Sequence, residues 1–235
     1  MILYVNGDSH TAGAEAVNSY SFACDDSLYW NMGREPHPDN LRVSYGCELA
    51  NMLGAILECH AESASSNDRI IRTTYDAVEI FRPDLVIIGW STWEREEWWD
   101  EGTQQYWQVN AGGIGHDWPD NIKEQYRGYI ANLNYDQAVR HAHGKIHLLH
   151  RNLADAQIPH IFFNTWEPFS NLPRFDWGSS YIEPYDPDYT YYNWLTAHGF
   201  QTVRPESYHF GPEAHRAWAE FLYQNYVQSI LTKNE

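Results

Sequence analysis

The sequence has few cysteines, few basic residues and no long apolar run. Its three cysteines, Cys24, Cys47 and Cys59, lack metal-ligand spacing, and an odd number cannot all pair in disulfides, so we expect a reducing compartment. No apolar stretch approaches the ~18 residues that would span a bilayer, and the N-terminus lacks the basic and apolar regions of a signal peptide. These absences predict a soluble, cytoplasmic protein, although release by lysis or within a particle would leave no mark in the sequence.

Basic residues are outnumbered by acidic ones, 15 to 32, which gives a formal net charge of −17. A phosphate backbone or an anionic membrane surface would repel such a chain, so nucleic acid and membrane are poor partners. Aromatic residues are abundant, with 11 Trp and 17 Tyr. This composition is typical of a globular protein with aromatic-lined grooves, and it predicts a small-molecule or glycan ligand while leaving the oligomeric state open.

Short apolar runs alternate with amphipathic segments along the chain. The runs predict strands at 2–6, 55–59, 85–90 and 160–164, with a weaker one at 201–203. The segments between them have helical spacing at 43–53, 67–81, 121–156 and 212–231. This alternation predicts an α/β fold with a mostly parallel sheet of about five strands and helices on both faces. A length of 235 residues favours one domain, 1–235, with long aromatic-rich loops at about 93–120 and 166–194.

Two short motifs lie at opposite ends of the chain. Gly7-Asp8-Ser9 directly follows the first predicted strand, where a serine would be exposed at the sheet edge near free backbone N–H groups. Near the other end, Glu206 and His209 stand together on a loop before the last predicted helix. Residues that follow parallel strands converge on one crevice, which also brings in residues 64–67 and 89–92.

These motifs resemble those of the SGNH (GDSL-type) hydrolases, in which a flavodoxin-like three-layer sandwich carries a Gly-Asp-Ser nucleophile motif and a late Asp-x-x-His motif. The resemblance runs through the whole chain in order, and Glu206-x-x-His209 matches the second motif with Glu in place of Asp. It implies that Ser9 is the nucleophile, that His209 is the general base and then acid, and that Glu206 orients the imidazole. It implies neither a cofactor nor a metal.

The chain departs from the family pattern at the oxyanion positions. The family's oxyanion Gly corresponds to Ala64, which still offers a backbone N–H, and its oxyanion Asn corresponds to Ser91. We expect the N–H groups of Ser9 and Ala64 and the hydroxyl of Ser91 to hold the oxyanion, with Asn67 as a further donor. Loss of one side-chain donor of this kind can cost ~2.7–4 kcal/mol of transition-state stabilisation.

The resemblance implies an esterase that removes an acetyl or other small acyl group from a carbohydrate through a Ser9 acyl-enzyme. We expect His10, Trp90 and Arg95 to contact the substrate, Arg95 by binding an acidic group. Carbohydrate is preferred to lipid because aromatic rings of the long loops can stack on sugar faces. These rings belong to Trp93, Trp98, Trp99, Tyr106, Trp107, Trp118, Trp166, Trp177, Tyr181, Tyr185 and Tyr189.

Two alternatives to an esterase stay open on the same fold. One is a non-catalytic glycan-binding or particle-associated protein, and the other is an O-acyltransferase that uses the same serine. A histidine cluster offers a competing metal site, because imidazole is a common metal ligand and several of these residues share a helix face. Its members are His141, His143, His147 and His150. No carboxylate or cysteine is spaced to complete a ligand shell, so we expect no metal there.

Overall fold

A four-stranded parallel sheet forms the centre of the computed structural model, which describes residues 1–21, 35–111, 114–115 and 118–232. Cys24 lies outside these residues. The strand order is β2-β1-β3-β6, with β1 at Ile2–Asn6, β2 at Ile56–Cys59, β3 at Leu85–Trp90 and β6 at His160–Asn164. The central β3 and the adjacent β6 are buried along their whole length, as expected for strands covered on both faces. The predicted α/β class is confirmed.

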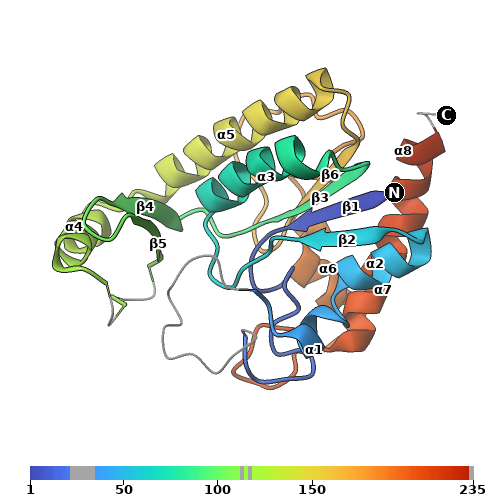
Figure 1. Ribbon diagram of the computed structural model, residues 1–235, viewed down its shortest axis with the longest axis horizontal. Helices are drawn as coiled ribbons and strands as arrows, with labels where there is room; N and C mark the ends of the chain where they lie inside the picture. The colour runs from blue at the N-terminus through green and yellow to red at the C-terminus, as the bar shows by residue number, and fades with distance from the viewer. Residues whose placement is uncertain (22–34, 112–113, 116–117, 233–235) are drawn as a thin grey trace.

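Helices cover both faces of this sheet (Figure 1). One face packs against α3 (Asn67–Phe81) and α5 (Tyr135–Asp155). The other packs against α2 (Tyr45–Leu53), α6 (Tyr191–Ala197), α7 (Pro212–Leu222) and α8 (Gln228–Thr232). Neighbouring strand residues serve opposite faces, since Leu3 and Val5 lie in one core cluster and Tyr4 lies in the other. The sheet is therefore the middle layer of three.

Several predicted elements differ from the observed ones. Residues 201–203 form no strand, because only Thr202 pairs there, in an isolated antiparallel bridge to Phe210. The predicted helix 121–156 is two helices, α4 (Asp120–Ala131) and α5, and Asn134 begins the second by accepting a hydrogen bond from the Gln137 N–H. The last predicted helix is divided by a π-helical turn, η2, at Tyr223–Val227. Three short helical elements were not predicted, namely α1 (Pro38–Leu41), η1 (Pro187–Tyr189) and α6 (Tyr191–Ala197).

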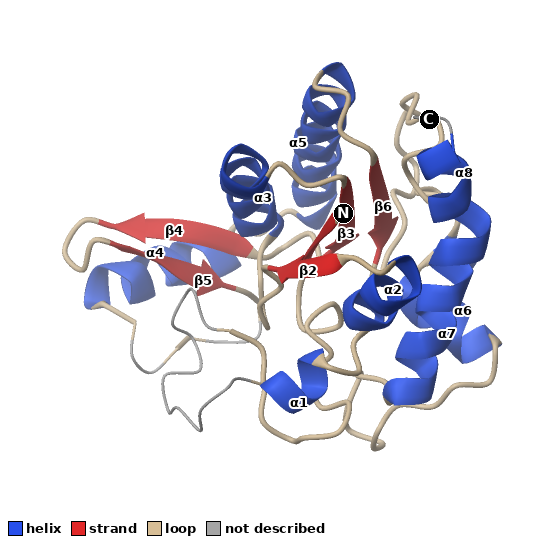
Figure 2. Cartoon of the chain, turned by 45° about the vertical axis from the view of Figure 1, so that its right-hand side comes forward, coloured by secondary structure: helices blue, strands red, loops and turns tan. Residues whose placement is uncertain are grey.

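An antiparallel hairpin stands in the first of the two predicted loops. It pairs β4 (Glu96–Asp100) with β5 (Gln105–Val109) and projects with α4 away from the central sheet (Figures 1 and 2). Arg72 of α3 ties the hairpin to the body, since its guanidinium donates to both Glu97 carboxylate oxygens at 2.8–2.9 Å. The hairpin and α4 enclose a small core of their own, made of Trp107, Val109, Trp118, Ile122 and Tyr126.

Five of the eleven loop aromatics that were expected to stack on sugar faces are packed inside the protein. Trp93, Trp107, Trp118, Trp177 and Tyr181 are all buried. Their rings pack against other aromatic side chains, as Trp93 does on Phe169 with centroids 4.7 Å apart. These five rings hold the long loops on the domain, and the other six are half-buried or exposed.

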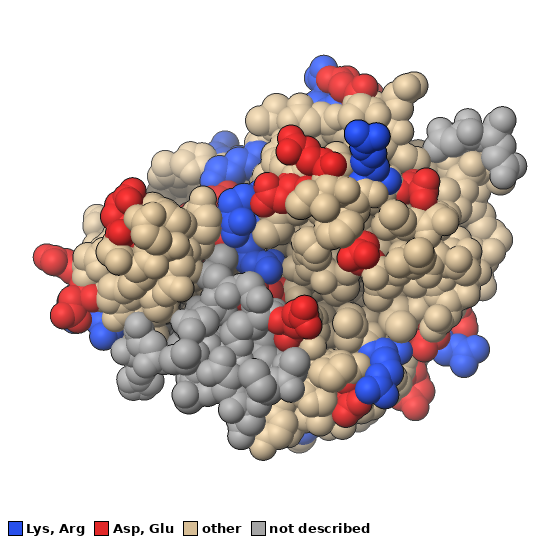
Figure 3. Space-filling view, in the orientation of Figure 1, with Lys and Arg blue, Asp and Glu red and all other residues tan. Residues whose placement is uncertain are grey.

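Charged side chains of both signs are interspersed on the face drawn in Figure 3. Some form pairs that join separate elements, such as Lys145 of α5 with Asp68 of α3 at 2.7 Å. In the part of the chain that the structure describes, no helix has the length and apolar character needed to cross a membrane.

Candidate active site

The chain turns sharply where β1 ends, and Gly7 makes this turn. A Cβ at Gly7 would lie 2.1 Å from Thr11 Oγ1 and 2.8 Å from the Gly89 carbonyl oxygen, so a larger residue does not fit. Asn6 fixes the strand end, because its amide donates to the Ile70 carbonyl of α3 at 3.1 Å. Successive turns follow, and the Ser9 carbonyl accepts from the Ala14 N–H at 2.9 Å. Ser9 is thereby held, half-buried, at the carboxyl edge of the sheet.

His209 contacts Ser9 from the loop that precedes α7. Its Nε2 lies 2.9 Å from Ser9 Oγ, although the two residues are 200 positions apart. The bridge between Thr202 and Phe210 holds this loop, together with a 2.9 Å hydrogen bond from the Val203 N–H to the His209 carbonyl. The structure thus brings together the two predicted residues from opposite ends of the chain.

The carboxylate beside the His209 imidazole is Glu15, whose Oε2 lies 2.7 Å from Nδ1. A carboxylate accepts hydrogen bonds only, so Nδ1 carries the proton and Nε2 is left to accept from the Ser9 hydroxyl. Glu206 is exposed and bonds to no described residue. Ser207 takes the inward position instead and donates to Glu15 Oε2 at 2.6 Å. The expectation that Glu206 orients the imidazole is therefore corrected.

Several groups hold the Glu15 carboxylate in its ionised form. Partial burial alone would raise the pKa of Glu15, but hydrogen bonds from Ser207 and His209 lower it, as do electrostatic interactions with His209 and Arg204. Arg204 pairs with the second oxygen, Oε1. The Glu15 backbone has φ +63°, a left-handed conformation that non-glycine residues seldom adopt. This carboxylate was not predicted, since no spacing rule connects it to a histidine 194 positions away.

The backbone N–H groups of Ser9 and Ala64 were expected to hold an oxyanion. Neither Ser9 nor Ala64 donates its N–H to any described residue. The Glu62 N–H donates to the Gly7 carbonyl at 3.2 Å, which brings the 61–66 loop against the turn at Ser9. Ala64 has φ +67°, which turns its peptide out of the local hydrogen bonding, and it is the least buried residue of 61–66. The structure thus leaves both of these N–H groups without an acceptor among the described residues.

Ser91 and Asn67, the other expected oxyanion donors, are engaged elsewhere. The Ser91 hydroxyl donates to Asp8 Oδ2 at 3.0 Å. The Asn67 amide donates to the Ser91 and Thr92 carbonyls at 3.2 and 3.3 Å, and its oxygen accepts from the Ser91 N–H at 2.9 Å. Both side chains therefore stabilise the loop after β3. This corrects the expectation that they point donors at the substrate.

The three residues expected to bind substrate have different surroundings. His10 packs its ring 4.9 Å from that of His209 and 5.4 Å from that of Trp166. Burial, helped by the charges of His209 and Arg95, lowers the pKa of His10 well below its ordinary range, so it is a neutral wall of the site. Trp90 is fully buried in the core against Phe162, which corrects its expected role. Arg95 lies close to the site, on Asp8 and Ser91.

Three histidines of α5 pack against aromatic side chains and each other, whereas the fourth member of the predicted cluster, His141, is exposed. His143 Nε2 lies 3.0 Å from the Tyr185 hydroxyl, and the His147 ring stacks on Phe175 with centroids 4.0 Å apart. His150 Nδ1 lies 2.8 Å from His160 Nε2. Their polar atoms and ring faces thus contribute to holding the second long loop on α5.

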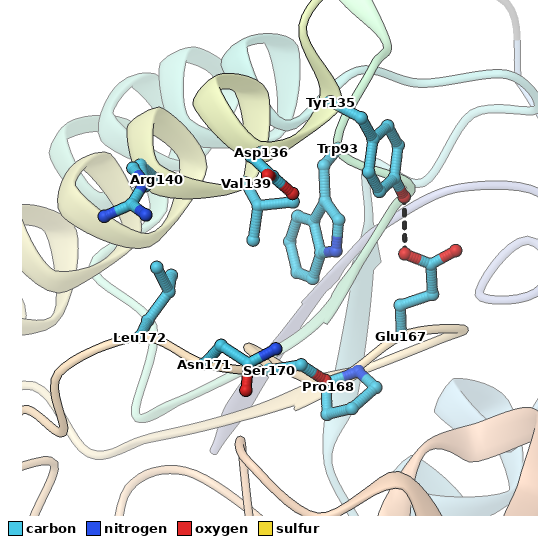
Figure 4. Close-up of a pocket in the computed structure, with 10 residues that line it drawn as sticks. All are labelled: Trp93, Tyr135, Asp136, Val139, Arg140, Glu167, Pro168, Ser170, Asn171 and Leu172. Carbon is cyan, nitrogen blue, oxygen red and sulfur yellow. Dashed lines mark hydrogen bonds between the residues drawn. The ribbon is translucent and has the colours of Figure 1, made fainter.

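A cavity of about 310 Å³ opens at the same edge of the sheet, between the start of α5 and residues 167–172 (Figure 4). Trp93 forms its inner wall, and Glu167 on one side accepts a hydrogen bond from the Tyr135 hydroxyl on the other. Two of the residues that line the cavity are close in the sequence to residues of the Ser9 site. Trp93 follows Ser91 by two residues, and Glu167 follows Trp166, whose ring contacts His10.

No family model matches the chain, and no curated protein matches it at a significant level. Solved structures with a similar fold include a psychrotrophic esterase from Pseudoalteromonas sp., inhibited by monoethylphosphonate (9% identity, 98% of this chain and 98% of that chain, TM-score 0.49). Another is a G-D-S-L family protein from Desulfitobacterium hafniense, with 13% identity and a TM-score of 0.44 over 94% of this chain and 96% of that chain. A third is an acetyl xylan esterase from Butyrivibrio proteoclasticus, with 12% identity and a TM-score of 0.39 over 94% of this chain and 63% of that chain. Such low identities and TM-scores describe a broad likeness in fold, so the function must be inferred from the site itself.

Proposed function

We propose that the protein is a serine esterase in which Ser9 is the nucleophile, His209 the general base and then acid, and Glu15 the group that orients the imidazole. One observation carries this proposal: an unbroken chain of contacts from the Ser9 hydroxyl through His209 to Glu15, at 2.9 and 2.7 Å. A hydroxyl, an imidazole and a carboxylate in this order activate a serine for attack on a carbonyl carbon.

The reaction begins when Ser9 Oγ attacks the ester carbonyl and its proton passes to His209 Nε2. The N–H groups of Ser9 and Ala64 donate to the oxyanion that forms. Collapse of the tetrahedral intermediate breaks the bond to the alcohol, which leaves with the proton from Nε2, and an acyl-enzyme remains. Water then loses a proton to Nε2 and attacks the acyl carbon, and collapse releases the acid and restores the Ser9 hydroxyl.

The substrate that we propose is a carbohydrate carrying an acetyl or other small acyl group. The cavity between α5 and residues 167–172 supports this class, because apolar surfaces of Trp93, Val139 and Leu172 lie among polar groups. A sugar presents the same combination of apolar faces and hydroxyl groups, which can pair with side chains such as Asp136 and Asn171. Trp166, half-buried and next to His10, is the aromatic side chain best placed to contact the part of the substrate nearest the scissile bond.

The test of the activity is hydrolysis of p-nitrophenyl acetate, together with labelling by a fluorophosphonate. We expect the wild-type protein to turn over the ester and to carry one label on Ser9, and Ser9→Ala to lose both. Ser207→Ala is a control for labelling, since Ser207 is the other serine near the imidazole. Turnover by Ser9→Ala at the wild-type rate would refute the proposal. Product analysis with added alcohol separates hydrolysis from acyl transfer.

A further inference from the structure

A buried ion pair lies directly behind the nucleophile. Asp8 is fully buried, and its Oδ1 accepts a hydrogen bond from the His10 N–H at 3.1 Å. Its Oδ2 accepts from the Ser91 hydroxyl at 3.0 Å and from Arg95 Nη1 at 3.3 Å. Arg95 Nη1 also donates to Ser91 Oγ at 2.8 Å. The three side chains form a closed triangle of polar contacts one residue away from Ser9.

This triangle creates a difficulty for an esterase. A negative charge one residue from the nucleophile opposes the negative charge that develops on the substrate oxygen. The Ser91 hydroxyl cannot offset it, because its single proton is directed at Asp8. The site therefore lacks a side-chain donor at the position that would otherwise supply one, and it places a carboxylate nearby.

Arg95 has the donors that this position needs. A guanidinium has five N–H groups, and Nη1 supplies the two directed at Asp8 and Ser91. Nε and Nη2 donate to no described residue. The side chain is 19% exposed, so it is fixed by its partners and still reaches solvent. Its charge also contributes to lowering the pKa of His10, which packs on His209.

We propose that Arg95 completes the oxyanion hole, with its guanidinium in place of the absent amide donor. The inference rests on the proposed esterase function and adds a catalytic residue to it. Asp8 and Ser91 hold the guanidinium in one orientation before the substrate arrives, which is the condition under which a donor stabilises a transition state most. A charged donor forms a stronger hydrogen bond to an oxyanion than a neutral amide does.

The test compares Arg95→Gln with the wild-type protein on p-nitrophenyl acetate. We expect kcat to fall by about 10²–10³-fold while KM changes by less than about threefold, because the donor acts on the transition state alone. A trifluoromethyl ketone, which forms an oxyanion on the serine, should lose inhibition by the same factor as kcat/KM. Arg216→Gln is the matched control, since Arg216 lies on the surface of α7, and it should keep wild-type rates.

A second variant separates donation to the oxyanion from neutralisation of Asp8. In Asp8→Asn/Arg95→Gln no buried carboxylate is left unpaired, so activity would return if Arg95 only balanced that charge. We expect the double variant to stay at least 30-fold below wild type, and recovery to within threefold would overturn the inference. If the glutamine variants do not fold, Arg95→Lys gives the comparison, with an expected loss of tenfold or more. A wild-type protein without turnover would instead refute the esterase function itself.

Discussion

Replacement of Glu15 by Gln tests which carboxylate serves His209. The imidazole becomes positively charged when it takes the Ser9 proton, and the centres of the two charges are then about 4 Å apart. At an effective dielectric constant of about 20, they attract by about 4 kcal/mol, which corresponds to a factor of about 10³ in rate. Glutamine keeps the shape of the side chain and removes the charge. We expect Glu15→Gln to lower kcat by 10²–10⁴-fold with little change in KM.

The assay is steady-state hydrolysis of p-nitrophenyl acetate by three proteins: wild type, Glu15→Gln and Glu206→Gln. Glu206 is exposed and has no described partner, so Glu206→Gln should stay within twofold of wild type. Thermal unfolding of each protein shows whether a rate change reflects a folding defect. The reasoning fails if Glu15→Gln remains within threefold of wild type, or if Glu206→Gln loses as much activity as Glu15→Gln.

Two further predictions concern stability. Gly7→Ala should destabilise the fold by about 1–3 kcal/mol and reduce activity, because its methyl group would meet Thr11 and the Gly89 carbonyl. Gly128→Ala is the control, since Gly128 lies at an open position of α4, and this change should be neutral or stabilising by up to about 1 kcal/mol. Equal melting temperatures for the two variants would contradict this. Burial lowers the pKa of His215 to about 3, so between pH 6.5 and 3 the unfolded chain binds a proton there that the folded protein does not. The free energy of unfolding should therefore decrease as the pH falls below 6.5. When it is measured by urea unfolding at several pH values, its change with pH should be smaller in His215→Gln than in the wild type, by about 1.4 kcal/mol per pH unit.

The central sheet and its helices could be predicted because their sequence patterns are local. The stripe of apolar residues in 67–81 matches α3 (Asn67–Phe81) at both ends, where Ser66 caps the first turn and Arg82 ends the helix in a left-handed conformation. The β4–β5 hairpin was missed because polar residues interrupt its aromatic ones, so neither EEWWD nor QYWQV forms an apolar run. Its stability depends on contacts with distant residues, such as the pair between Arg72 and Glu97, which no local pattern reveals.

The site shows where reasoning from motifs reaches its limit. Spacing identified Ser9 and His209 as candidates, and the structure places them in contact. The same spacing pointed to Glu206, because a carboxylate three residues before a histidine fits the family pattern. Glu15 contacts the imidazole from a residue whose backbone is left-handed, and the Ser91 hydroxyl donates to the buried Asp8. Both contacts join residues that are far apart in the sequence, so no short motif predicts them.

The closeness of Glu15 to Ser9 along the chain has a consequence for engineering. Residues 7–15 carry both the hydroxyl and the carboxylate, so one short cassette contains two of the three groups that contact each other at the site. Grafting that cassette onto a related scaffold would move the two groups as a unit, and the recipient would need to contribute a histidine on an opposing loop together with the remaining oxyanion donors.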